Sequence, residues 1–338
     1  MIPLIPKKAF SSDKFHSYLH EAEKTNQWSN WGWAVGELER RARDMFEIED
    51  TKAIIATCSG TTALHAIIFA LRRRKGEDLR VATQDFTFAS NSLGPAQGPI
   101  VCDMTPDLEI DLDDLLIQQH AQIVIATNCF GHLLDLDKVV DKTEKRNKTL
   151  VLDNATVPYT YYKGRNSLNY GTASFLSLHT TKLIGFGEGG LAIIDKEYEE
   201  EVRTACNYGK VEEKFNERSG NFKMSELSAA GILQYWDHFN FTELRKRVVD
   251  NYFDIRYKLR DRDGAFWPNW GDDDDDKFFP SWCPFLYDNP EESLHDDLEG
   301  ISCKKYYMPL RGFPVSNAIY DRIMCYSLAK DFDKCLKK

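Results

Sequence analysis

Two ionisable side chains stand where a buried chain segment would not normally carry a charge. Lys182 lies among apolar and glycine residues, five positions after Ser177. Desolvation in such surroundings lowers the pKa of a lysine, which suits its amine for forming a Schiff base. Asp153 ends an apolar run and needs a charged or hydrogen-bonding partner there. Each residue alone has an ordinary alternative, namely a lysine that reaches solvent from a loop and an aspartate that caps the next loop.

Two further features accompany this pair. Small residues at 58–62 follow the first apolar run and lead directly into a helical pattern. Free N–H groups at such a helix start favour an anion such as phosphate, although a hydroxyl cap on an ordinary helix is the alternative. Phe88 follows the next apolar run, where it could stack on a planar cofactor or pack in the core. A phosphate site, a stacking aromatic, a carboxylate and a Schiff-base lysine, in this order, are what pyridoxal 5′-phosphate (PLP) requires.

The elements that must position these residues are predicted by short apolar runs of strand length. The runs occupy 53–57, 79–83, 99–102, 122–126, 149–153, 173–177 and 190–195. They lack polar alternation, which predicts strands buried on both faces. In residues 62–73, apolar side chains recur at helical spacing and form one stripe. We therefore expect an α/β fold with a mainly parallel central sheet flanked by helices, in which ligands bind at the carboxyl ends of the strands.

The pattern changes after Gly190. Residues 224–239 and 241–259 predict two long helices, and an aromatic and acidic stretch follows them. We expect a large domain of residues 1–240 and a smaller C-terminal α+β domain of residues 241–338. The five aspartates 272–276 lack the spaced ligands, central glycine and terminal glutamate of a calcium loop, so a solvated loop is expected there.

Composition argues against several other classes of protein. The 338 residues include 43 Lys and Arg against 53 Asp and Glu, and the net charge of −10 repels nucleic acid and anionic membranes. No apolar run approaches the roughly 18 residues of a membrane span, and the first residues lack a secretory signal pattern. The eight scattered cysteines predict reduced thiols and no metal site. We expect a cytoplasmic protein that binds no nucleic acid, membrane or metal.

In its motifs the sequence resembles the PLP-dependent sugar aminotransferases of the DegT/StrS family, which have the aspartate-aminotransferase fold (fold type I). The resemblance runs from about residue 35 to residue 240, and more loosely to the end. The matching motifs are, in chain order, Ser59-Gly-Thr-Thr-Ala-Leu64, Phe86-Thr-Phe88, Gly131, Tyr162-Lys-Gly164, Ser177 with Lys182, Gly187-Glu-Gly-Gly190 and Gly220-Asn-Phe-Lys-Met-Ser-Glu-Leu-Ser-Ala-Ala230.

The resemblance implies a role for each matching residue. Lys182 would hold PLP as a Schiff base, and Asp153 would pair with the pyridine nitrogen. Phe88 would stack on the ring. Three residues would bind the phosphate, namely Gly60, Thr61 and Ser177. Asn221 and Lys223 would reach the phosphate of a neighbouring subunit, so the working unit would be a homodimer with active sites at its interface.

The sequence departs from the family pattern at several positions. Thr156 stands where the family usually has Gln or Glu near the cofactor and substrate, so a shorter hydroxyl makes that contact or the contact is lost. Lys223 replaces the more usual Arg, so a compact ammonium stands in place of a planar guanidinium with its fork of donors. Thr172 stands where the family generally has Asp, and the C-terminal part is shorter than usual. These changes concern the identity of the substrate more than the PLP chemistry.

The resemblance implies transfer of an amino group from L-glutamate to a nucleotide-linked keto-deoxy sugar, as in deoxyamino sugar and polysaccharide biosynthesis. Lys182 would carry the proton between carbons. The Gly187-Glu-Gly-Gly190 turn favours a 4-keto-6-deoxyhexose, with a 3-keto sugar as the alternative. Other hypotheses are a PLP sugar dehydratase, which has histidine in place of the lysine, and a catalytically silent PLP-binding regulator, which Thr156 favours. A flavodoxin-like binding protein would leave the ordered motifs unexplained.

Overall fold

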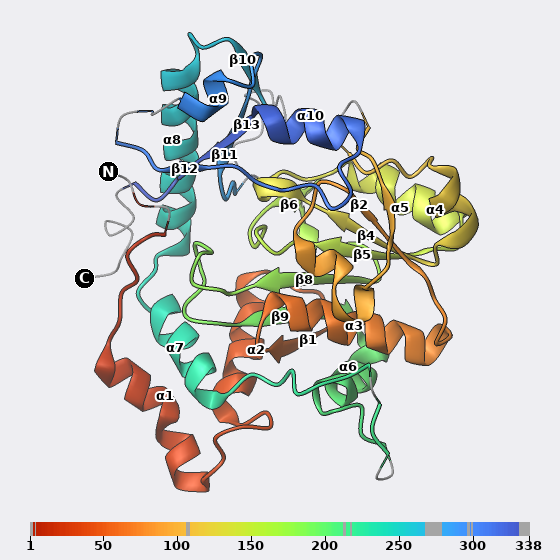
Figure 1. Ribbon diagram of the computed structural model, residues 1–338. Coiled ribbons are helices and arrows are strands. Elements are labelled where there is room, and N and C mark those ends of the chain that lie inside the picture. The colour runs from red at the N-terminus through yellow and green to blue at the C-terminus, as the bar shows by residue number, and fades with distance from the viewer. Residues whose placement is uncertain are drawn as a thin grey trace.

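The computed structural model describes residues 3, 5–105, 109–211, 214–216, 218–267, 279–295, 298 and 300–330. At its centre lies a seven-stranded sheet with the strand order β1-β9-β8-β5-β4-β2-β3 (Figure 1). Six of these strands run in one direction, and β9 pairs antiparallel with both of its neighbours. The strands are β1 (Lys52–Thr57), β2 (Val81–Gln84), β3 (Ile100–Cys102), β4 (Ile123–Thr127), β5 (Thr149–Asp153), β8 (Ala173–Ser177) and β9 (Gly190–Asp195).

The predicted strands are present, with ends that differ by one or two residues. β1, β4 and β5 are buried along their whole lengths, which explains their continuous apolar sequences. The second strand begins at Val81 rather than at residue 79. The connection from β8 to β9 contains no helix, so the chain cannot make a parallel crossover and turns back antiparallel. The start of β9 therefore meets the carboxyl ends of its neighbours.

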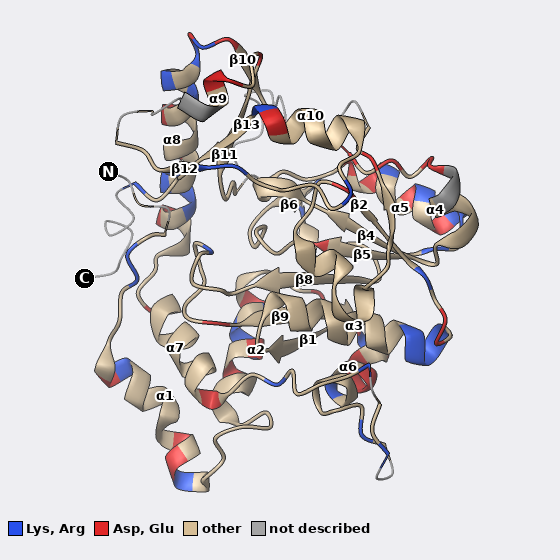
Figure 2. Cartoon of the chain, in the orientation of Figure 1, with Lys and Arg blue, Asp and Glu red and all other residues tan. Residues whose placement is uncertain are grey.

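Helices cover both faces of this sheet. On one face, α3 (Gly60–Lys75) and α6 (Glu199–Cys206) share a core with β1, β8 and β9. On the other, α2 (Trp33–Met45) and α7 (Glu226–Trp236) cover the same strands, with α1 (Ser12–Thr25) packed against them. α4 (Leu115–His120) and α5 (Leu136–Lys145) cover the remaining strands. Figure 2 shows the charged residues mainly on helices and loops around largely uncharged strands.

The helix predicted over 224–239 is shorter than expected. It begins after Ser225, whose Oγ accepts the N–H of Ser228 at 3.1 Å and so fixes the helix start. It ends at Trp236. Within the described ranges, no helix has both the length and the apolar character that a bilayer crossing requires.

A second, four-stranded antiparallel sheet lies above the first in Figure 1, with the order β10-β11-β13-β12. Its strands are β10 (Gly264–Phe266), β11 (Cys283–Tyr287), β12 (Cys303–Lys304) and β13 (Ile323–Tyr326). The accompanying helices are α8 (Phe241–Leu259), α9 (Glu292–His295) and α10 (Pro314–Arg322). All of these elements follow residue 240, which agrees with the predicted α/β fold class and its smaller C-terminal α+β part. The aspartates 272–276 lie outside the described residues.

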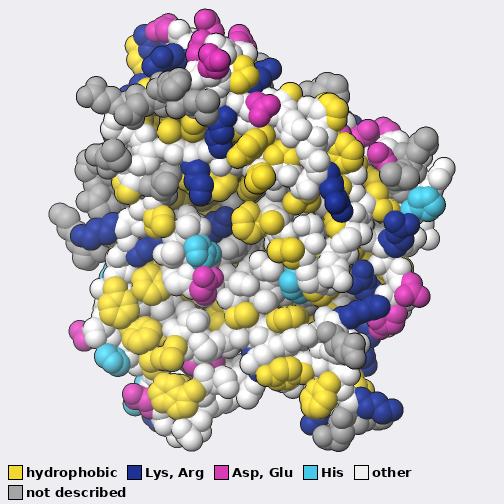
Figure 3. Space-filling model, in the orientation of Figure 1, with side chains coloured by type: hydrophobic (Ala, Val, Ile, Leu, Met, Phe, Trp, Pro, Cys, Tyr) yellow, Lys and Arg dark blue, Asp and Glu magenta, His cyan; other side chains and the backbone are white. Residues whose placement is uncertain are grey.

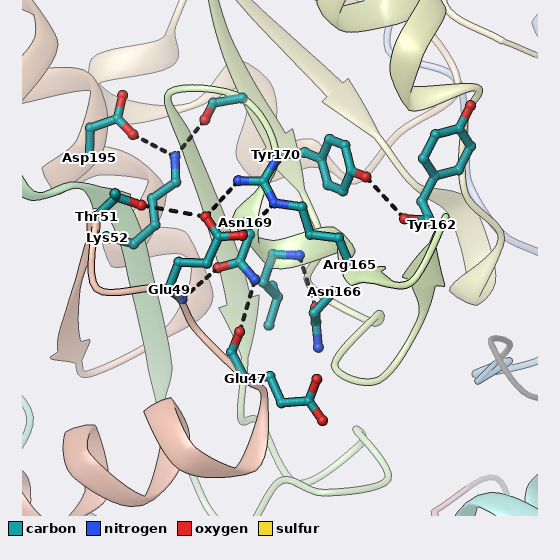
Figure 4. A network of polar contacts seen from close by, with 12 residues as sticks. Glu47, Glu49, Thr51, Lys52, Tyr162, Arg165, Asn166, Asn169, Tyr170 and Asp195 are labelled. Carbon is teal, nitrogen blue, oxygen red and sulfur yellow. Dashed lines mark hydrogen bonds and ion pairs between the residues drawn. The ribbon is translucent and has the colours of Figure 1, made fainter.

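A polar network holds the edge of the central sheet at which β1 begins (Figure 4). The buried Lys52 opens β1, and its Nζ lies 2.6 Å from Asp195 Oδ1 at the end of β9 and 2.6 Å from the carbonyl oxygen of Gly171. Arg165 of the short β7 (Arg165–Asn166), which pairs with β6 (Tyr161–Tyr162), donates two hydrogen bonds to Glu49 at 2.6 and 2.8 Å. Ion pairs and hydrogen bonds therefore hold this end of the sheet. The candidate functional site described below lies at the opposite end.

Candidate active site

A cavity of about 430 Å³ opens at the carboxyl ends of the parallel strands. It is lined by residues of the central sheet, of the β8–β9 connection and of the C-terminal part of the chain. Seven of the nine sequence-predicted site residues line this cavity: Gly60, Thr61, Phe88, Asp153, Thr156, Ser177 and Lys182. The other two, Asn221 and Lys223, are not among its lining residues.

Lys182 lies in the tight turn that connects β8 to β9. Its N–H donates to the carbonyl of His179 at 2.8 Å, and its own carbonyl accepts the N–H of Gly185 at 3.0 Å. A side chain at Gly185 would come within 2.1 Å of the His179 oxygen, so the turn closes only around a glycine. Desolvation lowers the pKa of Lys182, and the nearby Asp153 carboxylate opposes this shift. The amine is thus easier to deprotonate than that of an ordinary lysine.

Asp153 ends β5 with its carboxylate buried in the cavity wall. Oδ1 accepts the N–H of Ala155 at 3.0 Å, and Oδ2 accepts the Asn91 amide at 3.0 Å and the Thr127 hydroxyl at 3.4 Å. Burial raises the pKa of Asp153, while these donors and the charge of Lys182 act in the opposite direction. The carboxylate is held in one orientation, and among the described residues no cationic side chain forms an ion pair with it, which suits it to a positively charged ligand group.

Asn91 is a site residue that sequence reasoning missed. It is fully buried, and its Nδ2 also bonds Thr87 Oγ1 at 2.8 Å and Thr127 Oγ1 at 3.2 Å. The two hydroxyls lie 2.6 Å apart. One signal was available, since Asn91 and Thr87 belong to the stretch around Phe88 that follows β2, and buried Asn side chains require partners.

The predicted phosphate end of the cavity is the start of α3. Ser59 caps this helix, since its Oγ accepts the Thr62 N–H at 3.2 Å while Thr62 Oγ1 accepts the Ser59 N–H at 3.0 Å. The N–H groups of Gly60 and Thr61 belong to the first turn, where intrahelical acceptors are lacking. A Cβ on Gly60 would lie 3.0 Å from that of Ser177, so backbone and hydroxyl donors converge here. This donor set fits a phosphate.

Aromatic residues form the outer wall of the cavity. Phe88 lines it with 56% of its surface exposed, and its ring centroid lies 6.5 Å from that of Tyr307. Tyr307 stacks in parallel on Phe130 at 5.1 Å. Trp282 and Tyr306 continue the wall, with their ring centroids 5.4 Å apart. The sequence did not indicate these C-terminal residues, which follow no predicted strand.

Further polar residues line the cavity, among them Thr156, His179, Thr181, Glu188 and Lys304. His179 Nδ1 lies 2.7 Å from Thr181 Oγ1, and its Nε2 lies 3.4 Å from Glu188 Oε1. The buried Thr156 also lines the cavity, so the shorter hydroxyl that replaces Gln or Glu faces the same space. Lys304 of β12 reaches the cavity from the second sheet, with its Nζ 5.0 Å above the ring of Tyr306.

Asn221 and Lys223 lie on an outer surface of the chain. Asn221 is exposed and forms an isolated bridge with Asn207. Lys223 Nζ donates to Asn207 Oδ1 at 2.8 Å and lies 5.2 Å above the ring of Tyr208. The structure therefore does not bring these two side chains to the cavity of their own chain.

The fold and the cavity define an α/β protein in which a lysine of lowered pKa and a buried carboxylate share one pocket beside a helix start. The sequence profile of the DegT/DnrJ/EryC1/StrS aminotransferase family matches residues 11–325. The chain belongs to this family, which confirms the predicted family and its PLP-dependent aminotransferase class.

Curated relatives and solved structures agree with this assignment. The chain is 28% identical over 266 residues to dTDP-4-amino-4,6-dideoxy-D-glucose transaminase of Shigella dysenteriae, a match that covers 75% of this chain and 68% of that protein. It is 25% identical over 244 residues to GDP-perosamine synthase of Caulobacter vibrioides, covering 70% and 65% respectively. The matched regions thus span about two thirds of these relatives. The first is a transaminase of a dTDP-linked sugar, and the second is a synthase of a GDP-linked sugar.

Two solved structures show the same fold. DesI, crystallised with its TDP-sugar product, superposes with a TM-score of 0.79 at 21% identity, covering 99% of this chain and 90% of that one. 3-Amino-5-hydroxybenzoic acid synthase superposes with a TM-score of 0.80 at 17% identity, covering 99% and 96%. The predicted fold class, a PLP-dependent transferase fold with a mainly parallel sheet, is confirmed.

Proposed function

We propose that the protein is a PLP-dependent aminotransferase that moves an amino group from L-glutamate to a nucleotide-linked keto-deoxy sugar. The observation that carries this proposal is the joint presence of Lys182 and Asp153 in one cavity whose far end is the start of α3. The nucleotide-sugar aminotransferases among its relatives support the class of acceptor. We also propose residues 1–240 and 241–338 as two domains that enclose this cavity.

The residues of the cavity fit PLP. The first turn of α3 and Ser177 offer donors for a phosphate, and the close approach of Gly60 to Ser177 leaves no room for a larger side chain there. Asp153 is buried and fixed by Asn91, as an acceptor for a protonated ring nitrogen must be. Phe88 offers an aromatic face beside these groups. When bound, PLP supplies an electron sink for the carbon that carries the amino group.

Lys182 and Asp153 are the proposed catalytic residues. A lysine with a lowered pKa is deprotonated more readily near neutral pH, so Lys182 is suited both to covalent attachment and to proton transfer at the substrate carbon. Asp153 keeps its partner nitrogen protonated, because burial strengthens the attraction between the two charges. Thr156 replaces a longer side chain in the wall and leaves space beside these groups.

The acceptor would lie against the C-terminal wall of the cavity. Trp282 and Tyr306 present aromatic faces of the kind that pack on sugar rings, and Lys304 places a positive charge beside them for a diphosphate. The Gly187-Glu-Gly-Gly190 turn favours amination at C4, and amination at C3 is the alternative. Glu188 of this turn lines the cavity together with His179.

A homodimer is the proposed working unit. Asn221 and Lys223 are turned away from the cavity of their own chain, where a partner's phosphate could meet them. Large apolar side chains are exposed nearby, including Tyr208 at 48% and Phe215 at 68%. Figure 3 shows further hydrophobic side chains on the surface over α1 and α7. Covering such surfaces is a common reason for association.

The test is a pair of half-reactions followed by the absorbance of enzyme-bound PLP. We expect purified protein to bind PLP with an absorbance band that the Lys182→Ala variant lacks. L-Glutamate should remove the band, and a nucleotide-linked 4-keto-6-deoxyhexose should restore it, with the 3-keto sugar as a second arm. Binding without loss of the band on glutamate addition would indicate a dehydratase or a silent regulator. Restoration by simple 2-oxo acids alone would contradict the sugar assignment.

A further inference from the structure

Lys8, near the start of the chain, contacts the backbone of the turn that carries Lys182. Its Nζ donates to the carbonyl oxygen of Lys182 at 2.8 Å and to that of Leu183 at 3.3 Å. These contacts join residues 174 and 175 positions apart in the chain. A charged donor on two successive carbonyls restrains rotation of the peptide group between them, since charge-assisted hydrogen bonds are stronger than neutral ones.

Helix α7 supplies two more donors to the same turn. Tyr235 Oη donates to the carbonyl of Leu183 at 3.1 Å, and Trp236 Nε1 donates to the carbonyl of Ile184 at 2.9 Å. Three consecutive carbonyls after the Lys182 side chain are thus each held by a side chain from outside the turn. Such carbonyls would otherwise require water or backbone partners. This arrangement therefore fixes the turn through side chains that do not line the cavity.

The segment that carries Lys8 is itself anchored. The N–H of Ser11 donates to Oε1 of the buried Gln234 at 2.9 Å. The rings of Phe10 and Phe186 stack with centroids 6.1 Å apart, and Phe186 belongs to the β8–β9 connection. The Lys8 ammonium therefore approaches the turn from a segment tied to α7 and to the turn itself.

The charge of Lys8 is met by carbonyl oxygens and an aromatic ring. Its Nζ lies 4.7 Å from the centroid of Tyr235, the titratable side chain that α7 presents to it. Across the described ranges Lys8 forms no ion pair. Burial lowers the pKa of Lys8 to about 7. The strength of its hydrogen bonds thus changes near neutral pH, since a neutral amine is a weaker donor.

We infer that Lys8 is a positioning residue for Lys182. The Lys8 ammonium holds the carbonyl oxygens of Lys182 and Leu183, so that the reactive amine of Lys182 points into the cavity. This inference rests on the proposed function, because it concerns the covalent attachment of PLP to Lys182. Lys8 lies outside the cavity lining and acts through the backbone of Lys182.

The experiment measures the rate of covalent PLP attachment to protein freed of PLP, by absorbance and by borohydride reduction followed by peptide mass. We expect Lys8→Met to slow attachment about tenfold at pH 6.5, the equivalent of about 1.4 kcal/mol. Lys7→Met is the matched control, because the neighbouring Lys7 is exposed, and it should react as the wild type does. Thermal unfolding of each variant without PLP shows whether the fold is retained.

The pH dependence separates positioning from general stability. Lys8→Arg keeps a positive charge at every pH tested, so the ratio of its rate to that of the wild type should rise as the pH passes through about 7. Deprotonation of Lys182 is common to both proteins and cancels in this ratio. Should Lys8→Met not fold, Lys8→Gln replaces it. Its attachment should be slower than that of the wild type at pH 6.5, and the ratio of its rate to that of Lys8→Arg should stay constant through pH 7, because neither side chain titrates there.

The outcomes are distinct. Wild-type rates and a flat ratio in the folded Lys8 variants would overturn the inference while the proposed function stands. Wild-type protein that forms no reducible PLP adduct at Lys182 would overturn the proposed function itself, and the inference with it.

Discussion

At the scale of single residues, the site depends on two groups that burial pushes toward their neutral forms. Lys182 has a lowered pKa and Asp153 a raised one, in both cases chiefly because water is excluded. Neither residue was predicted by its type and place alone; the combination of both with the helix start at 58–62 and Phe88 led to the prediction. Asn91 was not predicted, because its place in the stretch after β2 does not show its contact with Asp153, which lies 62 residues further along the chain.

Asn91→Leu should weaken PLP binding. The change keeps a similar volume but removes an amide donor from Asp153 Oδ2, so the carboxylate is less well held and its pKa rises further. Loss of a hydrogen bond to a charged group costs about 1.5–3 kcal/mol, or roughly ten- to hundredfold in affinity. The measurement is a PLP titration by absorbance. Ser92→Ala is the control, since Ser92 is only partly buried and its hydroxyl bonds only the carbonyl of Ala89 in the described structure. Unchanged affinity in Asn91→Leu would contradict this account.

The pH dependence of PLP attachment should reveal the lowered pKa of Lys182. Only the neutral amine attacks the aldehyde, so the rate rises with pH as the proton leaves. Desolvation places this midpoint below the ordinary lysine value of 10.5, even though the charge of Asp153 opposes the shift. Stopped-flow absorbance between pH 6 and pH 10.5 measures it, with Lys182→Ala as background. A midpoint at or above that of free lysine would show that the amine is solvated.

At the scale of elements, the strands of the central sheet and their mainly parallel arrangement were predictable, and the reversal of β9 was not. Continuous apolar runs identify buried strands, but the reversal of β9 depends on a β8–β9 connection without a helix. The strands of the second sheet escaped prediction for a different reason. They are short and pair over long separations, as Phe285 does with Met324, so their sequences carry little local signal.

Gly190→Ala should disturb the phosphate end of the cavity through the reversed strand. A Cβ at Gly190 would lie 2.3 Å from the backbone of Ser59, so either β9 or the start of α3 must shift. We expect a loss of about 1–3 kcal/mol in the free energy of unfolding and weaker PLP binding. Denaturant unfolding and PLP titration measure the two effects.

A second glycine provides the control for this change. Gly36 lies in α2 with nothing within 4 Å of its ideal Cβ, so Gly36→Ala should stabilise the protein by about 0.5–1 kcal/mol. If Gly190→Ala behaved in the same way, the close approach of β9 to the helix start would not constrain the site.

At the scale of the whole molecule, the cavity exists only because the C-terminal part of the chain closes over the central sheet. Two aspartates that follow neighbouring strands make this connection. Asp85 Oδ1 accepts the N–H of Arg311 at 2.5 Å and its Oδ2 that of Phe313 at 2.7 Å. Asp103 accepts the N–H groups of Val315 and Ser316 at 2.9 Å each. Both carboxylates therefore accept N–H groups at the start of α10. The chain shortly before α10 carries Tyr306 and Tyr307, which line the cavity.

Asp85→Asn should therefore loosen the acceptor wall more than the PLP end. Asp85 is fully buried, and the amide keeps one acceptor while it loses the charge and one of the two backbone partners. We expect about 1–3 kcal/mol less stability. The KM for the keto-sugar nucleotide should rise about three- to tenfold, or about 1 kcal/mol, with the glutamate half-reaction almost unchanged. The exposed Asp78→Asn is the control for charge alone. Equal effects on both half-reactions would mean that the hydrogen bonds of Asp85 support the PLP end of the cavity as much as the acceptor wall.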